Sequence, residues 1–222
     1  MKEKILQYYN ELAPTYDENR FENSYGKFID AQERSFLHSF FKKKTFSKIL
    51  DLGCGTGRLL NFATHGLDFS AEMLKVAKEK FPEKNLKVGE ISDINFEEKF
   101  DCIFSFHVIM HQTKSETQLF LKECADKLEK DGVLLFDYPT RSRSKAENGE
   151  NNWHAKNTFS DSEILELVQE NWKILETSGI LFFPIHQFPN SLRKFLKPLD
   201  TILCNTLLRK WASYNIVVLE KR

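Results

Sequence analysis

The sequence predicts a doubly wound α/β fold, in which helices cover both faces of a mostly parallel sheet. Two patterns carry this prediction. Short apolar runs with the character of buried strands alternate with helical segments along the chain, and a glycine cluster follows the first apolar run. The alternation implies right-handed crossovers between parallel strands. In a sheet of this kind the ligand belongs at the carboxyl ends of the strands.

The segment 100–106 is the one interpreted as a continuously apolar run, as a strand buried on both faces requires. The first expected strand is entered from the basic run 42–44, and Asp131 and Gly132 form the turn that leads into the fifth. The segments expected to form strands are 47–52, 66–69, 86–89, 100–106, 133–138, 172–183 and 214–220.

The expected helices follow from apolar residues at helical spacing and from capping residues. Ser70 caps the helix that Pro82 ends, and Ser160 with Glu163 resembles a capping box. The segments expected to form helices are 2–12, 25–41, 58–63, 71–81, 115–128 and 160–169. A polar, aperiodic loop is expected to leave the fifth strand over 141–152.

Length and charge favour one domain that acts on a small molecule. No linker divides the 222 residues, so the chain is interpreted as one domain. Within it, 1–44 is interpreted as N-terminal helices, 45–140 as a ligand-binding core and 141–222 as a variable half. Lys plus Arg and Asp plus Glu are both 32, so no net charge favours a nucleic acid as partner.

The sequence predicts a cytoplasmic protein without an integral membrane segment. The first ten residues are charged and lack the apolar centre of a secretory signal. Four cysteines are scattered without metal-ligand spacing, so no disulfide is expected. The longest uncharged stretch, 177–192, is too short and too polar to span a bilayer.

The glycine cluster places Gly53, Gly55 and Gly57 directly after Asp51 and an apolar strand. Alternating glycines let a backbone turn sharply and approach a ligand closely. A dinucleotide fingerprint needs its third glycine one position later, where this chain has Arg58. The spacing therefore argues against a nicotinamide-dependent reductase, which remains the alternative enzyme class.

With Asp51 upstream, the loop resembles motif I of the class I S-adenosylmethionine-dependent methyltransferases, whose fold is a Rossmann-like sheet of seven strands. Further stretches in the family's order strengthen the resemblance, which covers about residues 1–140. They are 50–57 for the glycine loop, 66–74 for the second strand and its helix, 89–91 for the turn that contacts adenine, 100–107 for the fourth strand, 128–135 for the fifth strand, and 9–17 for the lid of small-molecule members.

The resemblance implies a pocket for S-adenosylmethionine and for its product S-adenosylhomocysteine. Gly53 and Gly55 would hold the methionine part, Asp51 would support the loop, and Asp68 would accept from the ribose hydroxyls. The remaining residues assigned to the cofactor by the resemblance are Tyr16, Cys54, Gly57, Phe69, Met73, Glu90, Ile91 and Phe106.

Alternatives remain open for several of these residues. Asp51 could be a loop cap and Asp68 a helix N-cap, while Tyr16, Phe69 and Met73 could be ordinary core. The stretch from Gly57 to Asp68 is shorter than most members have, so the register at Asp68 is a point to test. Glu90 stands where the family usually has Asp.

His107 and His111, at the end of the fourth strand, are the candidate substrate contacts or general base. Their spacing also suits a metal, but no Glu or third ligand accompanies them as in metalloproteases, so no metal is predicted. Packing or capping is the alternative for both histidines. Tyr138, at the end of the fifth strand, could face the acceptor or be a rim aromatic.

The sequence thus favours methyl transfer to oxygen, nitrogen or carbon of a small molecule. A non-catalytic cofactor-binding domain is the third interpretation. Residues 190–211 place leucines and cations at helical spacing around Pro198, which predicts a pair of short helices. They could pack only, or cap the acceptor pocket and bring an apolar or lipid-linked acceptor from a membrane surface.

Overall fold

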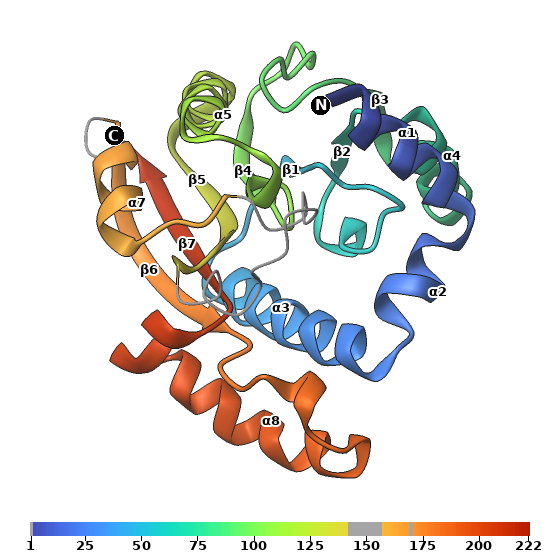
Figure 1. Cartoon of the computed structure of the whole chain (residues 1–222). Coiled ribbons are helices and arrows are strands. Elements are labelled where there is room, and N and C mark those ends of the chain that lie inside the picture. The colour runs from blue at the N-terminus through green and yellow to red at the C-terminus, as the bar shows by residue number, and fades with distance from the viewer. Residues whose placement is uncertain (1, 142–156, 169–170) are drawn as a thin grey trace.

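The computed structural model describes residues 2–141, 157–168 and 171–222 (Figure 1). Its centre is a seven-stranded sheet with the strand order β3-β2-β1-β4-β5-β7-β6. The strands are β1 (Ile49–Leu52), β2 (His65–Asp68), β3 (Asn85–Val88), β4 (Phe100–Ser105), β5 (Leu128–Pro139), β6 (Trp172–Ile180) and β7 (Tyr214–Lys221). Each expected strand is present, so the predicted fold class is confirmed.

The first five strands are parallel, and β7 lies antiparallel between β5 and β6. Leu50 pairs with His65 of β2 on one side and with Ile103 of β4 on the other. The strand order therefore reverses between β1 and β4. A doubly wound sheet opens a crevice at this point, beyond the carboxyl ends of its strands.

Helices pack on both faces of the sheet. One apolar core joins α3 and α4 to the sheet through residues such as Leu37 and Leu74. A second core joins α5 and α7 to the opposite face through residues such as Phe120 and Ile164. The helices are α1 (Lys2–Leu12), α2 (Tyr16–Phe21), α3 (Ser24–Lys43), α4 (Ala71–Lys80), α5 (Lys114–Lys127), α7 (Asp161–Val168) and α8 (Asn190–Cys204).

The predicted caps of two helices are present. The Ser70 hydroxyl accepts from the Met73 amide at the start of α4 (3.1 Å). At the start of α7, the Ser160 amide donates to Glu163 Oε2 (2.9 Å) while the Glu163 amide donates to Ser160 Oγ (3.3 Å). These bonds satisfy amides that have no partner within a first helical turn.

Three local predictions were wrong, and one helix was missed. Strand β5 begins at Leu128 and runs through Asp131 and Gly132, where a turn was expected. The two helical turns expected over 58–63 are a single 3-10 turn, η2 (Leu60–Phe62), because the chain must return to β2 at once. Helix α2 was missed because it is polar on nearly every side, which leaves no apolar period. Helix α8 runs on through Pro198 instead of breaking there, followed by the 3-10 turn η6 (Leu207–Trp211).

The loop expected over 141–152 lies mostly outside the described residues. Within the described ranges, no helix has both the length and the apolar character that crossing a bilayer requires. All four cysteines are buried as free thiols.

Candidate functional site

The glycine loop lies at the carboxyl end of β1, in the crevice between β1 and β4. Gly53, Gly55 and Gly57 all have positive φ angles, +82°, +53° and +86°, which residues with a side chain rarely adopt. A Cβ at Gly53 would approach the Val108 side chain to 2.4 Å, whereas a Cβ at Gly55 would meet nothing within 4 Å. The backbone at Gly55 therefore borders open space on the side that a ligand can reach.

Asp68, at the end of β2, holds this loop in place. Its Oδ2 accepts from the Gly55 amide (2.8 Å) and its Oδ1 from the Ser70 amide (2.9 Å). Burial raises the pKa of the Asp68 carboxyl to about 6, although the amides oppose the shift. Ser70, not Asp68, is the N-cap of α4. The short connection from Gly57 thus brings Asp68 into contact with the loop at Gly55.

A cavity of about 50 Å³ borders the loop, and Asp51 is one of its walls. The Asp51 side chain is 3% exposed. Burial raises its pKa to about 8, with Arg58 opposing the shift and Asp68 adding to it. The other residues that line the cavity are Tyr16, Phe21, Gly53, Cys54, Gly55, Thr56, Arg58, Leu59, Phe106 and His107.

The N-terminal segment from α1 to α2 forms a lid over this edge of the sheet. The Ser70 hydroxyl donates to Asn10 Oδ1 (2.6 Å), and the Thr56 hydroxyl donates to Asp17 Oδ1 (2.6 Å). Lys80, at the end of α4, also pairs with Asp17. The lid is thus fastened to the glycine loop and to both ends of α4, which explains the small volume of the cavity beneath it.

A buried charge cluster lies beside the cavity, between α3 and the ends of β4 and β5. Glu33 is 1% exposed, and its two oxygens contact Arg58 Nη2 (2.6 Å) and His107 Nε2 (2.7 Å). The His107 amide donates to Asp137 Oδ1 (2.7 Å), and Arg58 also pairs with Asp30 (2.7 Å). Two basic groups are therefore held among three carboxylates.

The cluster sets the charge of its members. Burial by itself raises the pKa of Glu33, but Arg58 and His107 outweigh it and hold that pKa at about 2. Burial by itself lowers the pKa of His107, but Glu33 and Asp137 outweigh it, so the pKa of His107 is raised. His107 has a φ of +61°, a strained conformation that the surrounding contacts maintain.

His111 takes part in a different group. Its Nε2 lies 3.0 Å from the Tyr9 hydroxyl of α1, and the two rings meet edge to face. The Tyr9 ring also meets those of Tyr16 and Phe69. The two histidines therefore contact different partners. Among the described residues, the group with metal-ligand proximity is Glu33, His107 and Asp137, and Arg58 already neutralises Glu33 there.

The other residues assigned by the resemblance divide into two sets. Tyr16, Cys54 and Phe106 line the cavity with Gly53 and Gly55, whereas Gly57 and Asp68 lie outside its lining. Phe69 is half-buried beside the lid, and Met73 is 2% exposed within α4. Glu90 and Ile91 follow β3, outside the cavity lining, where Glu90 bridges to Asp93. Tyr138 is buried and donates to Asp161 (2.8 Å), so it is not a rim aromatic.

Sequence reasoning missed several members of this site. Arg58 was noted only because it replaces a glycine, and Glu33 and Asp30 lie in a helix before the first strand. Asp137 lies within a strand otherwise interpreted as core. Their common signal is a charged residue inside an apolar segment, and the fold is needed to show that they meet.

The comparisons with known proteins agree with this geometry. A family model described as a methyltransferase domain matches residues 50–136. A ubiquinone/menaquinone biosynthesis C-methyltransferase of Campylobacter jejuni is 31% identical over 149 residues, which cover 60% of this chain and 63% of the relative. The chain therefore spans less than two thirds of that relative's length.

Solved structures share the fold. An S-adenosylmethionine-dependent methyltransferase of Clostridium acetobutylicum superposes with a TM-score of 0.64 at 18% identity, covering 96% of this chain and 98% of that one. Magnesium protoporphyrin IX methyltransferase of Synechocystis, with bound S-adenosylhomocysteine, gives 0.70 at 14% identity over both whole chains. Residues 50–136 thus match a methyltransferase domain, and the sequence relatives and the fold support the class I S-adenosylmethionine-dependent methyltransferases that the motifs predict.

Proposed function

We propose that this chain transfers the methyl group of S-adenosylmethionine to a small-molecule acceptor. The observation that carries the proposal is the cavity between β1 and β4, where Asp51 and the backbone of Gly53 and Gly55 lie under a fastened lid. A nicotinamide dinucleotide finds less support, because Arg58 occupies the position of the third glycine and pairs with Glu33. We also propose that 1–222 acts as one cytoplasmic domain.

The residues around the cavity suit the parts of the cofactor. Asp51, once ionised, offers a carboxylate to the methionine ammonium, assisted by the backbone at Phe106. Asp68 offers oxygens to the ribose hydroxyls by giving up or sharing its bonds with Gly55 and Ser70. Adenine would lie toward β3. Tyr16, Cys54, Gly57, Phe69, Met73, Glu90 and Ile91 complete the proposed binding set.

Cofactor entry requires the lid to open. Pockets for molecules of this kind enclose roughly 300 to 1,000 Å³, whereas the cavity under the closed lid is about 50 Å³. The bonds of Asn10 to Ser70 and of Asp17 to Thr56 are the ones that opening would break. Closing the lid again would exclude water from the reacting groups.

Methyl transfer is an in-line displacement that needs orientation and, for a protonated acceptor, a base. His107 is poorly suited as that base, because Glu33 and Asp137 favour its charged form. His111 is the better candidate: the Tyr9 hydroxyl can take the acceptor's proton as its own proton passes to His111 Nε2. His107 and Arg58 then serve to bind and orient the acceptor.

The proposal is tested in two steps. Calorimetry should show micromolar binding of S-adenosylhomocysteine and no comparable binding of reduced nicotinamide dinucleotides. Incubation with methyl-labelled cofactor and extracted cell metabolites should then label a small molecule. Binding of the nicotinamide in place of the cofactor would support the reductase, and cofactor binding without any labelling would support the non-catalytic domain.

The roles of Tyr9 and His111 have their own test. With the labelled acceptor in hand, Tyr9→Phe and His111→Gln should each lower turnover about a hundredfold, the lower range for general base catalysis. Affinity for S-adenosylhomocysteine should stay unchanged. Turnover within a factor of about two of wild type in both variants would remove the pair from the proton path.

A further inference from the structure

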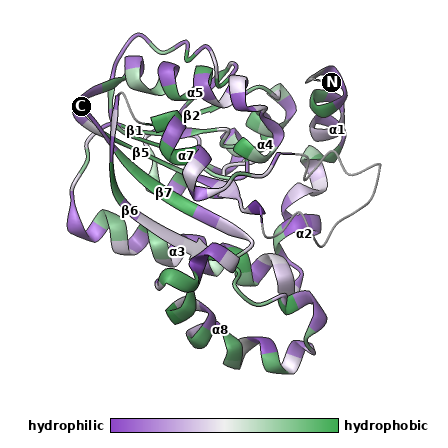
Figure 2. Cartoon of the chain, turned by 60° about the vertical axis from the view of Figure 1, so that its left-hand side comes forward, coloured by the Kyte–Doolittle hydropathy of each residue, from purple (hydrophilic) through white to green (hydrophobic). Residues whose placement is uncertain are grey.

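Helix α8 turns its apolar side to solvent, whereas a helix that packs only on its own protein buries that side. Its apolar residues Leu192, Phe195, Leu199 and Ile202 recur at helical spacing and are 48% to 69% exposed. Asp200, on the other side of the helix, is 0% exposed. In Figure 2, hydrophobic and hydrophilic segments alternate along α8 at the lower end of the molecule.

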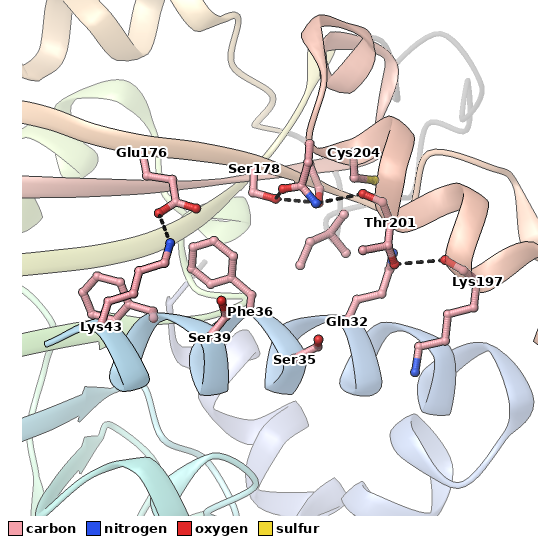
Figure 3. A pocket seen from close by; sticks show the side chains of 14 residues that line it. Gln32, Ser35, Phe36, Ser39, Lys43, Glu176, Ser178, Lys197, Thr201 and Cys204 are labelled. Carbon is pink, nitrogen blue, oxygen red and sulfur yellow. Dashed lines mark hydrogen bonds and ion pairs between the residues drawn. The ribbon is translucent and has the colours of Figure 1, made fainter.

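The buried side of α8 carries a carboxylate, Asp200, which is held by polar groups beneath the helix. Asp200 accepts from Gln32 Nε2 (2.7 Å) and from the amides of Phe183 (2.7 Å) and Phe182 (3.3 Å). Between α3, β6 and α8 lies a cavity of about 220 Å³ whose walls are partly polar, with Ser35, Lys43 and Thr201 among the polar residues (Figure 3). These bonds fix the rotation of α8, so its apolar side is presented outward.

The apolar surface continues onto η6. Leu207 is 89% exposed, Leu208 37% and Trp211 53%. We call this surface, from Leu192 to Trp211, the α8–η6 patch. Seven of the eleven exposed large apolar side chains in the described residues belong to it. Scattered exposed leucines need no explanation, but a continuous patch indicates a partner.

The charges around the patch identify the partner. Asp200 is the sole acidic residue in 190–211 and is buried. Of the basic residues there, Lys210 is exposed and Arg193 and Lys197 are half-buried, while Arg209 pairs with Asp161 (2.9 Å). Lys210 lies over the Trp211 ring at 4.4 Å. Two copies meeting at this patch about a two-fold axis would bring these cations together. A bilayer with anionic lipids would instead attract them.

We propose that the α8–η6 patch docks this protein on the surface of an anionic lipid bilayer. The helix would lie in the interface, with Phe195, Ile202 and Leu207 inserted and Lys210 among the headgroups. Trp211 suits the boundary between headgroups and acyl chains. The chemistry is that of an amphipathic helix lying on a membrane.

The place of the patch in the fold links docking to the active edge. Strands β5 and β6 both run antiparallel to β7, so β6 ends at the same edge as the glycine loop. The segment 181–213 leaves and re-enters the sheet there, and the Tyr214 ring at its return meets that of His107 (5.6 Å). This step rests on the proposed function: docking would bring the acceptor site to an apolar or lipid-linked acceptor.

Vesicle sedimentation tests the docking without any methyl transfer. The full chain should bind vesicles of phosphatidylcholine with phosphatidylglycerol at least about tenfold better than phosphatidylcholine alone, because each cation contributes near an anionic surface. High salt should abolish the difference. Lys210→Gln should lower binding about fivefold. No binding to anionic vesicles at low salt would overturn the proposal.

A matched pair of double variants separates the patch from general surface hydrophobicity. Phe195→Asp with Ile202→Asp should lower vesicle binding at least about tenfold. Leu119→Asp with Leu165→Asp changes side chains that are 55% and 49% exposed on α5 and α7, and should leave binding unchanged. Equal loss in both pairs would overturn the proposal. Affinity for S-adenosylhomocysteine and circular dichroism check that each variant is folded.

Two further readouts test the membrane assignment by other means. The tryptophan emission of wild type should shift to the blue on anionic vesicles, and Trp211→Phe should remove the shift; an equal shift in Trp211→Phe would contradict the assignment. Sedimentation velocity gives the oligomeric state. A dimer that the Phe195→Asp, Ile202→Asp variant separates, without vesicle binding by wild type, would make a second copy the occupant and overturn the membrane assignment.

Discussion

Helices α4 and α8 have the same amphipathic pattern and opposite orientations. In α4, Met73, Leu74 and Ala77 are buried at 2%, 6% and 0% exposure, and Lys75 and Lys78 are exposed. In α8, the apolar stripe is exposed and the carboxylate of Asp200 is buried. Both helices follow strands that end at the carboxyl edge of the sheet.

The surfaces beneath the two helices explain the difference. Helix α4 packs on an apolar face of the sheet, so its apolar stripe turns inward. Helix α8 lies over the amides of Phe182 and Phe183, which need an acceptor once they are buried. Satisfying these amides with Asp200 turns the stripe outward. A buried polar anchor therefore decides the orientation that hydrophobic periodicity leaves open.

The largest expected effect is the contrast in stability between the two helices. Leu74→Ala should lower the free energy of unfolding by about 2 to 5 kcal/mol, because it removes buried apolar contacts and leaves a cavity. Phe195→Ala, which removes a larger side chain that is 69% exposed, should change it by less than about 0.5 kcal/mol. Urea unfolding measures both. Equal losses would show that Phe195 is covered in solution.

The second effect concerns cofactor affinity, which should depend on residues near the start of α4 and not on those of α8. Asp68→Asn should weaken binding of S-adenosylhomocysteine by about 1.5 to 3 kcal/mol, the range for losing hydrogen bonds to a charged group. Phe195→Ala is the control and should bind as wild type does. Because Asp68 also accepts from Gly55 and Ser70, unfolding of the variant is measured separately. Unchanged affinity in Asp68→Asn would remove Asp68 from the site.

The smallest effect is a pH dependence that arises from Asp51. At neutral pH its carboxyl is mostly protonated in the free protein, since its pKa is raised to about 8. Pairing with a ligand ammonium requires loss of that proton. Affinity for S-adenosylhomocysteine should therefore rise with pH between about 6 and 8, by at most about tenfold per unit, and then level off.

The stability of the free protein should change in the opposite direction. A carboxyl whose pKa is raised on folding stabilises the protein at low pH, and this contribution is lost as pH rises from the unfolded pKa toward about 8. Calorimetry in buffers of different ionisation enthalpy counts the proton released on binding. Asp51→Asn should abolish the proton release on binding and the rise of affinity with pH, whereas Phe195→Ala should keep both. A flat profile in wild type would rule out the role of Asp51.

The sequence was sufficient for the architecture and for the glycine loop. Each strand was expected because its apolar run is bounded by turn residues, and Asp68 was assigned through the resemblance as the acid that ends β2. The prediction of a helix over 58–63 was wrong because hydrophobic periodicity alone does not show how soon the chain must rejoin the sheet. Helix α2 failed because its polar sequence has no apolar face, and contacts with the glycine loop hold it instead.

The charge cluster could not be predicted, because its members come from α3, the glycine loop, β4 and β5. Glu33 and His107 are 74 positions apart, and only the crossing of α3 over the ends of the strands brings them within 2.7 Å. The difference between His107 and His111 is of the same kind. Their spacing places both at one edge, but the partners that set the protonation of each lie on other elements.

The antiparallel strand β7 sets the order in which the sheet can form. It fills the gap between β5 and β6, yet its residues 214–221 come last in this sequence, about eighty positions after those of β5. As the chain leaves the ribosome, the five parallel strands can pair first, while β6 and the segment after it wait without a neighbour. Such long-range pairing slows folding and leaves an open strand edge. A nascent chain that pauses before residue 214 would therefore expose the edge of β5, and chaperones should engage it at that stage of synthesis.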